Sequence, residues 1–84
     1  MARVIVSPAA ESDVLEIWGY IARDSPVAAD RIVDRFDALF RKLALSPGIG
    51  KSADELDTGL RMFPTGNYLV FYRSNESDIE IVRW

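Results

Sequence analysis

The feature that most constrains the fold is LRMFPTGNYLVFYR at residues 60–73, two apolar runs around a turn. Side chains alternate along a strand, so the apolar residues of the second run divide between two faces. Leu69 and Phe71 point one way, and three residues point the other way: Tyr68, Val70 and Tyr72. A strand with one face in water normally alternates apolar and polar residues. The rest of the chain must therefore cover one apolar face, and the other face is left for solvent or for a partner.

Strands are expected at both ends of the chain. Residues 60–63, 68–73 and 78–84 are separated by turn-forming tetrapeptides and predict a three-stranded antiparallel meander. The short β-branched run at residues 3–6 predicts a further strand. Residues 47–59 are rich in Gly, Ser and Asp and are expected to form a loop, with a single helical turn at Asp54 to Leu56.

Two helices are expected between the first strand and this loop. Ser7 and Ser25 are suitable N-caps, and each is followed by a proline at the first helical position. Apolar residues then recur at spacings of three and four, which gives each helix one apolar stripe. The first helix should end near Arg23 and the second near Pro47. The short connection between them predicts an antiparallel helical hairpin.

The order β-α-α-β-β-β predicts an α+β fold for one domain, residues 1–84, with the helical hairpin packed on one face of an antiparallel sheet. No second helical layer is available for the other face. We expect that face to carry five residues: Arg61, Phe63, Tyr68, Val70 and Tyr72. An exposed apolar patch of this size on a small protein marks a partner site.

Composition excludes several classes of function. Cysteine and histidine are absent, which removes disulfides, thiol nucleophiles, Cys/His metal sites and the usual general base near neutral pH. The net charge of -3 argues against a protein that holds nucleic acid by its overall field. No apolar run could cross a bilayer, and the N-terminal MARVIVSP lacks the apolar region of a signal peptide, so we expect no membrane association and a cytoplasmic location.

Two further patterns do not support the chemistry that they suggest. The run PGIGK at residues 47–51 has one residue between its glycines, where a phosphate-binding loop needs four. The acidic run at residues 54–57 lacks the spacing of a calcium-binding loop. Asp37 and Arg41 are spaced for an ion pair on the solvated face of the second helix. We expect no metal and no cofactor.

Three arginines lie on the predicted meander: Arg61, Arg73 and Arg83. In one interpretation they solubilise the sheet and pair with nearby acids: Glu76, Asp78 and Glu80. In the other, Arg61 and Arg83 lie close together at the rim and, with Tyr68 and Tyr72, recognise an anionic partner. Cleavage of a phosphodiester would also need a base, and this sheet offers only tyrosines and those acids.

Several motifs, in this order, resemble the ParE branch of the RelE/ParE toxins of bacterial type II toxin–antitoxin modules. They are AESDVLEIWGYIA, RIVDRFDALFRKLALSPGIG and ELDTGLRMFPTGNYLVFYR followed by IEIVR, and they cover nearly the whole chain. The most specific of them is similar to the family pattern E-L-x-x-G-L-R-x-F-x-x-G-x-Y-x-x-x-Y-R.

The resemblance implies a growth-inhibiting toxin that binds a cognate, ParD-like antitoxin in a hetero-oligomer and acts on DNA gyrase without being an enzyme. The alternative is a RelE-like, ribosome-dependent mRNA endonuclease using Arg61 and Arg83. The chain lacks the Lys cluster and His of RelE-type members, so it looks closer to ParE. We expect six residues to contact a partner: Arg61, Phe63, Tyr68, Tyr72, Arg83 and Trp84.

One departure from the family concerns the end of the chain. Family members commonly continue past the final strand with a segment resembling H-G-A-R-D, whereas this sequence ends at Trp84. If that segment contributes to inhibition of the target, a version without it would bind antitoxin and be weakly toxic or inert. A truncated, non-toxic antitoxin-binding module is therefore a further alternative.

Overall fold

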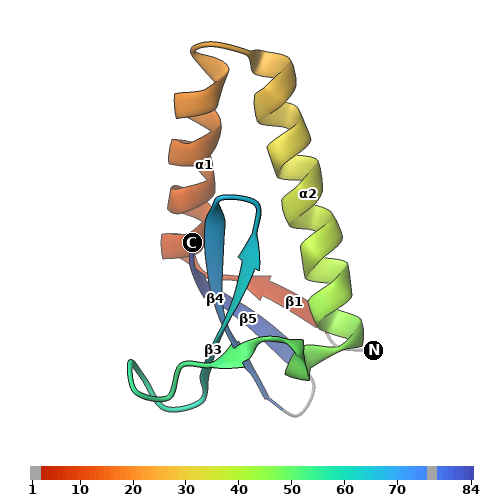
Figure 1. Ribbon diagram of the computed structural model, residues 1–84, viewed down its shortest axis with the longest axis vertical. Helices are drawn as coiled ribbons and strands as arrows, with labels where there is room; N and C mark the ends of the chain where they lie inside the picture. The colour runs from red at the N-terminus through yellow and green to blue at the C-terminus, as the bar shows by residue number, and fades with distance from the viewer. Residues whose placement is uncertain (1–2, 76–77) are drawn as a thin grey trace.

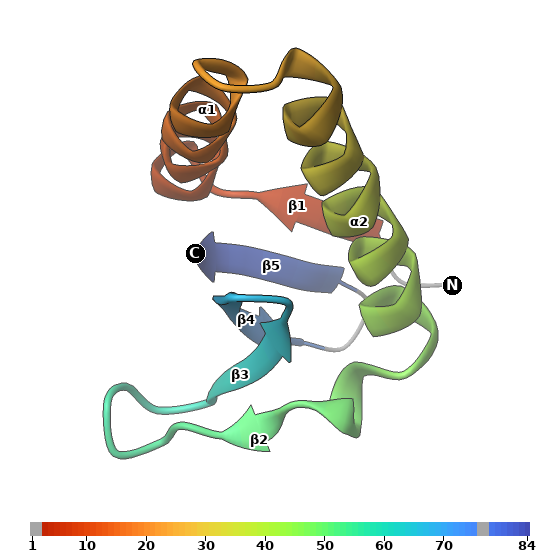
Figure 2. The same ribbon diagram turned by 45° about the horizontal axis from the view of Figure 1, so that its top comes forward.

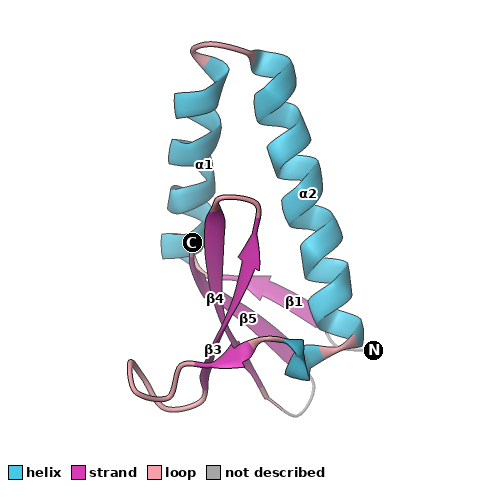
Figure 3. Ribbon diagram, viewed as in Figure 1, coloured by secondary structure: helices cyan, strands magenta, loops and turns pink. Residues whose placement is uncertain are grey.

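The computed structural model describes residues 3–75 and 78–84, and its elements follow the predicted order with one short strand added (Figure 3). The turn predicted at residues 74–77 and the acid Glu76 lie partly or wholly outside the described residues. The elements are β1 (Arg3–Val6), α1 (Pro8–Ala22), α2 (Pro26–Leu45), the 3-10 turn η1 (Pro47–Ile49), β2 (Lys51–Ser52), β3 (Leu60–Thr65), β4 (Tyr68–Ser74) and β5 (Asp78–Arg83).

Both predicted helix starts are confirmed. The Ser7 hydroxyl accepts a hydrogen bond from the Ala10 N–H at 3.0 Å, and the Ser25 hydroxyl accepts one from the Ala28 N–H at 3.2 Å. Each cap satisfies one of the N–H groups that a helix leaves free at its start. α1 and α2 run antiparallel, side by side (Figure 1). Asp37 and Arg41 form no ion pair within 4.0 Å among the described residues, so that expectation is wrong.

The α+β class is confirmed, and the sheet is mixed rather than wholly antiparallel. Its strand order is β1-β5-β4-β3-β2, in which β3, β4 and β5 form the predicted antiparallel meander. β1 pairs with β5 in parallel, because the helical hairpin between β1 and the meander acts as a crossover connection. β2 pairs with β3 inside the segment predicted to be a loop. The helical turn expected at residues 54–56 is present as hydrogen bonds from Leu56 and Asp57 to the Ala53 carbonyl.

The face of the sheet beneath the helices is the one that carries Val70 and Tyr72. Both side chains are fully buried, and the register places Arg61, Phe63 and Tyr68 on the same side as these two. Our expectation that these five residues lie on the uncovered face is therefore wrong. The register explains the difference, because Tyr72 lies opposite Ile81 and the core-forming residues of β4 and β5 therefore share one face. The central cluster of the core contains Ala10, Leu39, Leu43, Val70, Tyr72, Ile79 and Ile81.

The opposite face of the sheet carries the other parity of β4. Leu69 is 45% exposed and Phe71 is half-buried, and Ile5 of β1 is also 45% exposed. Of the two apolar faces in residues 60–73, the helices therefore cover the one that carries Tyr72, and the one that carries Leu69 stays uncovered. The hairpin itself extends beyond the sheet, as Figure 2 shows from a second direction. Apolar side chains on it, such as Leu15 and Tyr20, remain more than two-thirds exposed.

Candidate functional site

Arg61 lies on β3 and holds the segment that follows α2. Its Nη1 donates a hydrogen bond to the Gly50 carbonyl oxygen at 2.8 Å. Tyr72, opposite Arg61 on β4, holds the same segment twice, because its hydroxyl accepts from the Gly50 N–H at 2.8 Å and donates to the Pro47 carbonyl oxygen at 2.7 Å. The two side chains together satisfy three backbone groups of a segment that has few partners of its own.

Gly50 is required by this arrangement. A Cβ atom at this position would lie 2.3 Å from the Tyr72 hydroxyl oxygen, which is far inside van der Waals contact. Burial raises the pKa of the Tyr72 hydroxyl above its ordinary value, against the opposing effects of the Gly50 N–H and the Arg61 charge. The phenol is therefore neutral near pH 7, and it acts as a structural donor and acceptor rather than as a base.

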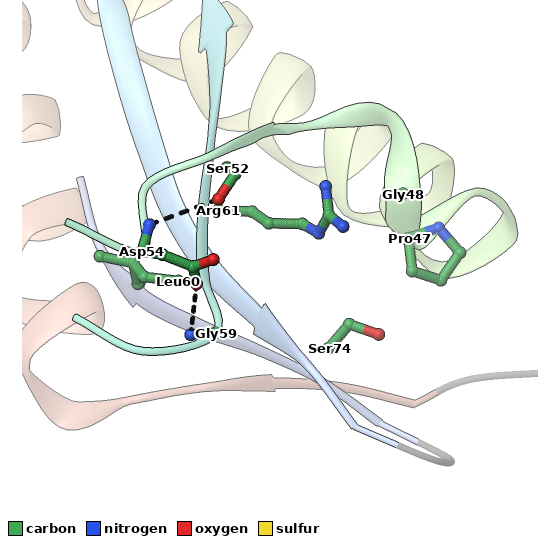
Figure 4. Close-up of a pocket in the computed structure, with 8 residues that line it drawn as sticks. All are labelled: Pro47, Gly48, Ser52, Asp54, Gly59, Leu60, Arg61 and Ser74. Carbon is green, nitrogen blue, oxygen red and sulfur yellow. Dashed lines mark hydrogen bonds between the residues drawn. The ribbon is translucent and has the colours of Figure 1, made fainter. Parts of the chain in front are cut away.

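A polar pocket of about 380 Å³ opens beside Arg61. Its lining residues come from the post-α2 segment and from β3 and β4: Pro47, Gly48, Ser52, Asp54, Gly59, Leu60, Arg61 and Ser74. Figure 4 shows the guanidinium extending across the pocket toward Pro47 and Gly48. The Asp54 carboxylate is turned to its own loop, where it accepts a hydrogen bond from the Gly59 N–H at 2.8 Å. Since a guanidinium has five N–H donors, the pocket can accept an anionic group.

Arg83 makes a different set of contacts at the end of β5. Its Nε and Nη2 donate to the two carboxylate oxygens of Asp13 on α1, at 2.8 and 2.9 Å. The Trp84 N–H donates to Asp13 Oδ2 at 3.0 Å. The hydrogen bond from Arg83 lowers the pKa of Asp13 below its ordinary value, against the opposing effect of burial. We call this set the Asp13 clamp: Asp13, Arg83 and the backbone of Trp84.

The Asp13 clamp positions an aromatic ring over α2. Trp84 stacks on Phe36 with ring centroids 3.8 Å apart, and Phe40 lies tilted against the same ring at 5.8 Å. Tyr68 meets Phe36 edge-on at 5.9 Å. The Trp84 indole N–H is buried and has no hydrogen-bond partner among the described residues. These ring contacts pack the end of β5 and the start of β4 against α2.

The predicted site residues are therefore distributed rather than assembled. Arg61 and Arg83 lie on β3 and β5 with β4 between them, and their guanidinium groups bind different backbone and side-chain partners. Arg83 is exposed, as expected, but its contacts are with Asp13 rather than with an anion shared with Arg61. Phe63 lies on the helix-facing side, and its ring centroid is 5.3 Å from Lys42 Nζ.

The other interpretation of the arginines is confirmed in part. Arg73 forms ion pairs with Asp57 and with Glu80, and Asp78 pairs with Arg3. Glu80 lies across from Arg73 in the sheet register, which is the cross-strand pairing expected for opposite charges.

Sequence reasoning missed Asp13 and Gly50 as structural partners of the two arginines. Asp13 was visible only as an acid near the start of a helix, and nothing in its spacing indicates a partner 70 residues away. Gly50 belongs to the run LSPGIG, whose glycine could have indicated a close backbone approach.

The described residues also bear on metal binding and membrane insertion. Across residues 3–75 and 78–84, no group of three or more potential metal ligands converges. In the same residues, no helix combines the length and the apolar character needed to cross a membrane.

Comparison with known proteins identifies the family. The model of the family described as "ParE toxin of type II toxin-antitoxin system, parDE" matches residues 4–83. The chain belongs to the ParE toxin family. This ParE-type toxin is 31% identical over 84 residues to Toxin ParE1 of Mycobacterium tuberculosis, a match that spans 98% of the chain and 86% of that relative. It is 29% identical over 84 residues to Toxin ParE3 of Caulobacter vibrioides, across 99% of the chain and 84% of the relative.

A solved structure supports the fold of this ParE-type toxin. A chain from "Chromosomal ParDE TA system from P. aeruginosa" superposes with a TM-score of 0.78, covering 99% of this chain and 92% of that one. The sequence identity is 19%, so the match bears on the fold alone. The predicted membership of the ParE branch and the predicted α+β architecture are thus confirmed.

Proposed function

We propose that this ParE-type toxin inhibits growth by binding DNA gyrase, without catalysis, and that a cognate ParD-like antitoxin neutralises it in a hetero-oligomer. The observation that carries this proposal is that Arg61 and Arg83 are both engaged in contacts within the fold. Arg61 holds the Gly50 carbonyl, and both Asp13 oxygens are occupied by Arg83, so each arginine stabilises a neighbouring segment. A toxin that binds gyrase would act in the cytoplasm.

The chemistry around the arginines also favours binding over cleavage. An RNase needs a group that takes a proton from the ribose hydroxyl. The hydroxyl of Tyr72, the residue opposite Arg61 in the sheet, is buried and neutral and already donates to Pro47. Asp13, next to Arg83, has a lowered pKa and accepts three hydrogen bonds, which makes it a poor base.

Antitoxin binding is supported by the apolar surface that the fold leaves open. A groove of about 370 Å³ lies between the two helices and β1, lined by Val6, Glu11, Val14, Leu15 and Phe40. Leu15 is 71% exposed, and Leu69 on the opposite sheet face is 45% exposed. Surfaces of this kind on a small domain are covered by a partner segment that folds as it binds.

The test measures both steps with purified proteins. The toxin should block DNA supercoiling by gyrase, and an equimolar amount of the product of the adjacent antitoxin reading frame should restore it. Expression in cells should induce the DNA-damage response before bulk mRNA declines. Rapid cleavage of ribosome-bound mRNA without DNA damage would instead support the RelE-like alternative. Antitoxin binding without growth arrest at high expression would support the non-toxic binding module.

The role of Arg83 in toxicity is separable from its role in the Asp13 clamp. Asp13→Ala releases Arg83 without removing it, whereas Arg83→Ala removes the guanidinium. If Arg83 contacts the target, Arg83→Ala should abolish growth arrest and Asp13→Ala should retain most of it. Equal losses in both variants, with matching losses of thermal stability, would show that Arg83 acts only through the clamp.

A further inference from the structure

The four arginines on the strands of the sheet differ in whether they have an acidic partner. Arg61 forms no ion pair within 4.0 Å in residues 3–75 and 78–84. The chain contains 13 acidic residues, so a shortage of carboxylates is not the reason. The other three arginines all form ion pairs: Arg3 with Asp78, Arg73 with Asp57 and Glu80, and Arg83 with Asp13.

The sheet register explains why Arg61 differs. Opposite charges pair when they lie across from one another on adjacent strands, as Arg73 and Glu80 do. The residues across from Arg61 are Ser52 on β2 and Tyr72 on β4, and neither is charged near pH 7. The guanidinium instead extends across the polar pocket of about 380 Å³ between the post-α2 segment, β3 and β4 (Figure 4). We call this pocket the Arg61 pocket.

The Arg61 pocket offers more hydrogen-bond donors than the fold uses. Of the five N–H groups of the guanidinium, one donates to the Gly50 carbonyl, and no other bond from Arg61 forms among the described residues. The Ser52 hydroxyl accepts from the Asp54 N–H at 3.4 Å, so its own O–H is available to donate. The Ser74 hydroxyl has no partner within the described residues. A guanidinium with free donors suits a carboxylate, which it can bind with two parallel hydrogen bonds.

The one acid that lines the pocket is held by its own loop. Asp54 Oδ1 accepts a hydrogen bond from the Gly59 N–H at 2.8 Å, and Asp54 forms no ion pair with Arg61 within 4.0 Å. Gly59 has a φ of 77°, a conformation that glycine adopts easily and other residues rarely adopt. The loop therefore fixes Asp54 without satisfying Arg61.

The charges in the pocket favour a carboxylate over a nucleic acid. Arg61 is the only cation among the described residues that line the pocket, and Asp54 adds a negative charge. Nucleic-acid binding depends on several cations that neutralise successive phosphates, and this chain has a net charge of -3. The volume lies in the range of pockets that hold small organic groups, so a whole Asp or Glu side chain can enter.

We propose that the Arg61 pocket binds an Asp or Glu side chain of the protein target, with its carboxylate on the Arg61 guanidinium and hydrogen bonds from Ser52 and Ser74. This inference rests on the proposed function, since it names a contact that the toxin makes with gyrase. The pocket shares no lining residue with the groove between the helices and β1. Affinities for the target and for the antitoxin can therefore be measured separately.

The experiment fills the pocket and leaves Arg61 in place, because Arg61 also holds the Gly50 carbonyl. Ser52→Asp puts a carboxylate directly across from Arg61 in the sheet register, where it competes with the carboxylate of the target. The control Thr58→Asp adds the same charge at an exposed position that does not line the pocket. Each variant is titrated with purified gyrase, with and without DNA. Without DNA, Ser52→Asp should bind at least about tenfold more weakly, and Thr58→Asp less than about threefold more weakly.

A second variant separates charge from size. Ser52→Asn matches Ser52→Asp in size and carries no charge, so it should weaken binding to gyrase less than Ser52→Asp does. Thermal unfolding should show Ser52→Asp to be at least as stable as the unmodified toxin, because the new carboxylate gains a cross-strand partner in Arg61. Equal losses of affinity in the two Ser52 variants would overturn the pocket assignment.

The remaining outcomes separate this inference from the proposed function. If the unmodified toxin does not bind gyrase, the proposed function is overturned and the pocket assignment falls with it. If the toxin binds and Ser52→Asp loses no more affinity than Thr58→Asp, only the pocket assignment is overturned. A loss seen only when DNA is present would assign the pocket to a phosphate and overturn the carboxylate. An equal loss of affinity for the product of the adjacent antitoxin reading frame would also overturn it, because the pocket would then not be specific to the target.

Discussion

At the scale of single residues, the decisive contacts join Tyr72, Gly50 and Arg61. The Tyr72 hydroxyl is buried and forms two hydrogen bonds with the segment after α2, and Arg61 adds a third at the Gly50 carbonyl. A buried polar group without a hydrogen-bond partner lowers the free energy of unfolding. Removing one partner of these bonds should therefore destabilise the fold by more than the bonds themselves contribute. The residues that the sequence indicated as partner contacts thus include two that stabilise the fold.

Replacing Tyr72 by Phe should be costly although it removes one oxygen atom. The substitution leaves the Gly50 N–H and the Pro47 carbonyl without a partner, which should cost about 1–3 kcal/mol in the free energy of unfolding. Tyr68→Phe is the matched control, because the Tyr68 hydroxyl forms no hydrogen bond among the described residues, and it should change the stability by less than about 0.5 kcal/mol. Equal losses in urea unfolding would contradict this assignment of Tyr72.

Gly50→Ala tests the close approach from the other side. The new Cβ would lie 2.3 Å from the Tyr72 hydroxyl oxygen, so the segment or the ring must shift, at about 1–3 kcal/mol. Gly48→Ala is the control, since a Cβ there meets no atom within 4 Å. In the double variant Gly50→Ala/Tyr72→Phe the 2.3 Å contact with the hydroxyl is removed, while the ring atoms Cε1 and Cζ remain 2.7 and 2.8 Å away. The clash is then relieved in part, so the combined loss should be smaller than the sum of the single losses. An additive result would sink the steric explanation.

At the scale of elements, two contacts join the first elements of the chain to the last strand. β1 pairs with β5 in parallel, and the Asp13 clamp connects α1 to the end of β5. The clamp ties the last residues of β5 to the second turn of α1 and sets Trp84 on Phe36 of α2. The Ser7 cap lies at the same junction, because its hydroxyl also donates to the Val82 carbonyl at 2.8 Å. The junction therefore couples the start of α1 to the end of the sheet.

The contribution of Asp13 should depend on pH with a defined sign. Its pKa in the folded protein is below the ordinary value of 3.8, so its stabilising effect is complete above that value and is lost as the pH falls through the folded pKa. The stability difference between the unmodified protein and Asp13→Asn should be constant from about pH 5 to 7 and shrink below about pH 4. The guanidinium of Arg83 stays charged throughout this range.

Chemical unfolding at each pH measures this effect, with Asp34→Asn as the control. Asp34 is exposed and forms no ion pair within the described residues, so its variant should show no comparable difference. A difference between the Asp13→Asn and unmodified proteins that is unchanged down to pH 3 would contradict the linkage.

Local sequence signals predicted the elements well because their causes are local. Caps at Ser7 and Ser25 and the apolar periodicity depend on neighbours within a few residues. Which face of the sheet the helices cover could not be predicted from local signals, because the residues on both faces of β4 are apolar. The choice between Leu69 and Tyr72 depends on β5, whose Ile81 lies opposite Tyr72, and on the helices above it. The Asp13 clamp likewise joins residues 70 positions apart.

At the scale of the whole molecule, a small core supports a large uncovered apolar surface. Among residues 3–75 and 78–84, eleven hydrophobic residues are buried, three of them alanines, and the fold measures 39 × 27 × 21 Å. Large side chains on several elements stay exposed, among them Leu15, Tyr20 and Leu69. A domain of this size has little stability in reserve. A partner that covers these surfaces would therefore stabilise the folded state.

Binding of the antitoxin should accordingly raise the midpoint of thermal unfolding in a concentration-dependent way. A ligand that binds only the folded state stabilises it by about 2.7 kcal/mol at a free concentration of 100 Kd. For a domain of about this size, that corresponds to a rise of roughly 10 °C or more in Tm. Because the exposed side chain of Leu15 borders the groove between the helices and β1, Leu15→Asp should reduce the rise at a fixed antitoxin concentration. Val27→Asp, at an exposed position outside that groove, serves as the control and should leave the rise unchanged. A Tm that stays constant across a wide range of antitoxin concentrations would show that the antitoxin does not bind the folded toxin, and the proposed neutralisation would have to be abandoned.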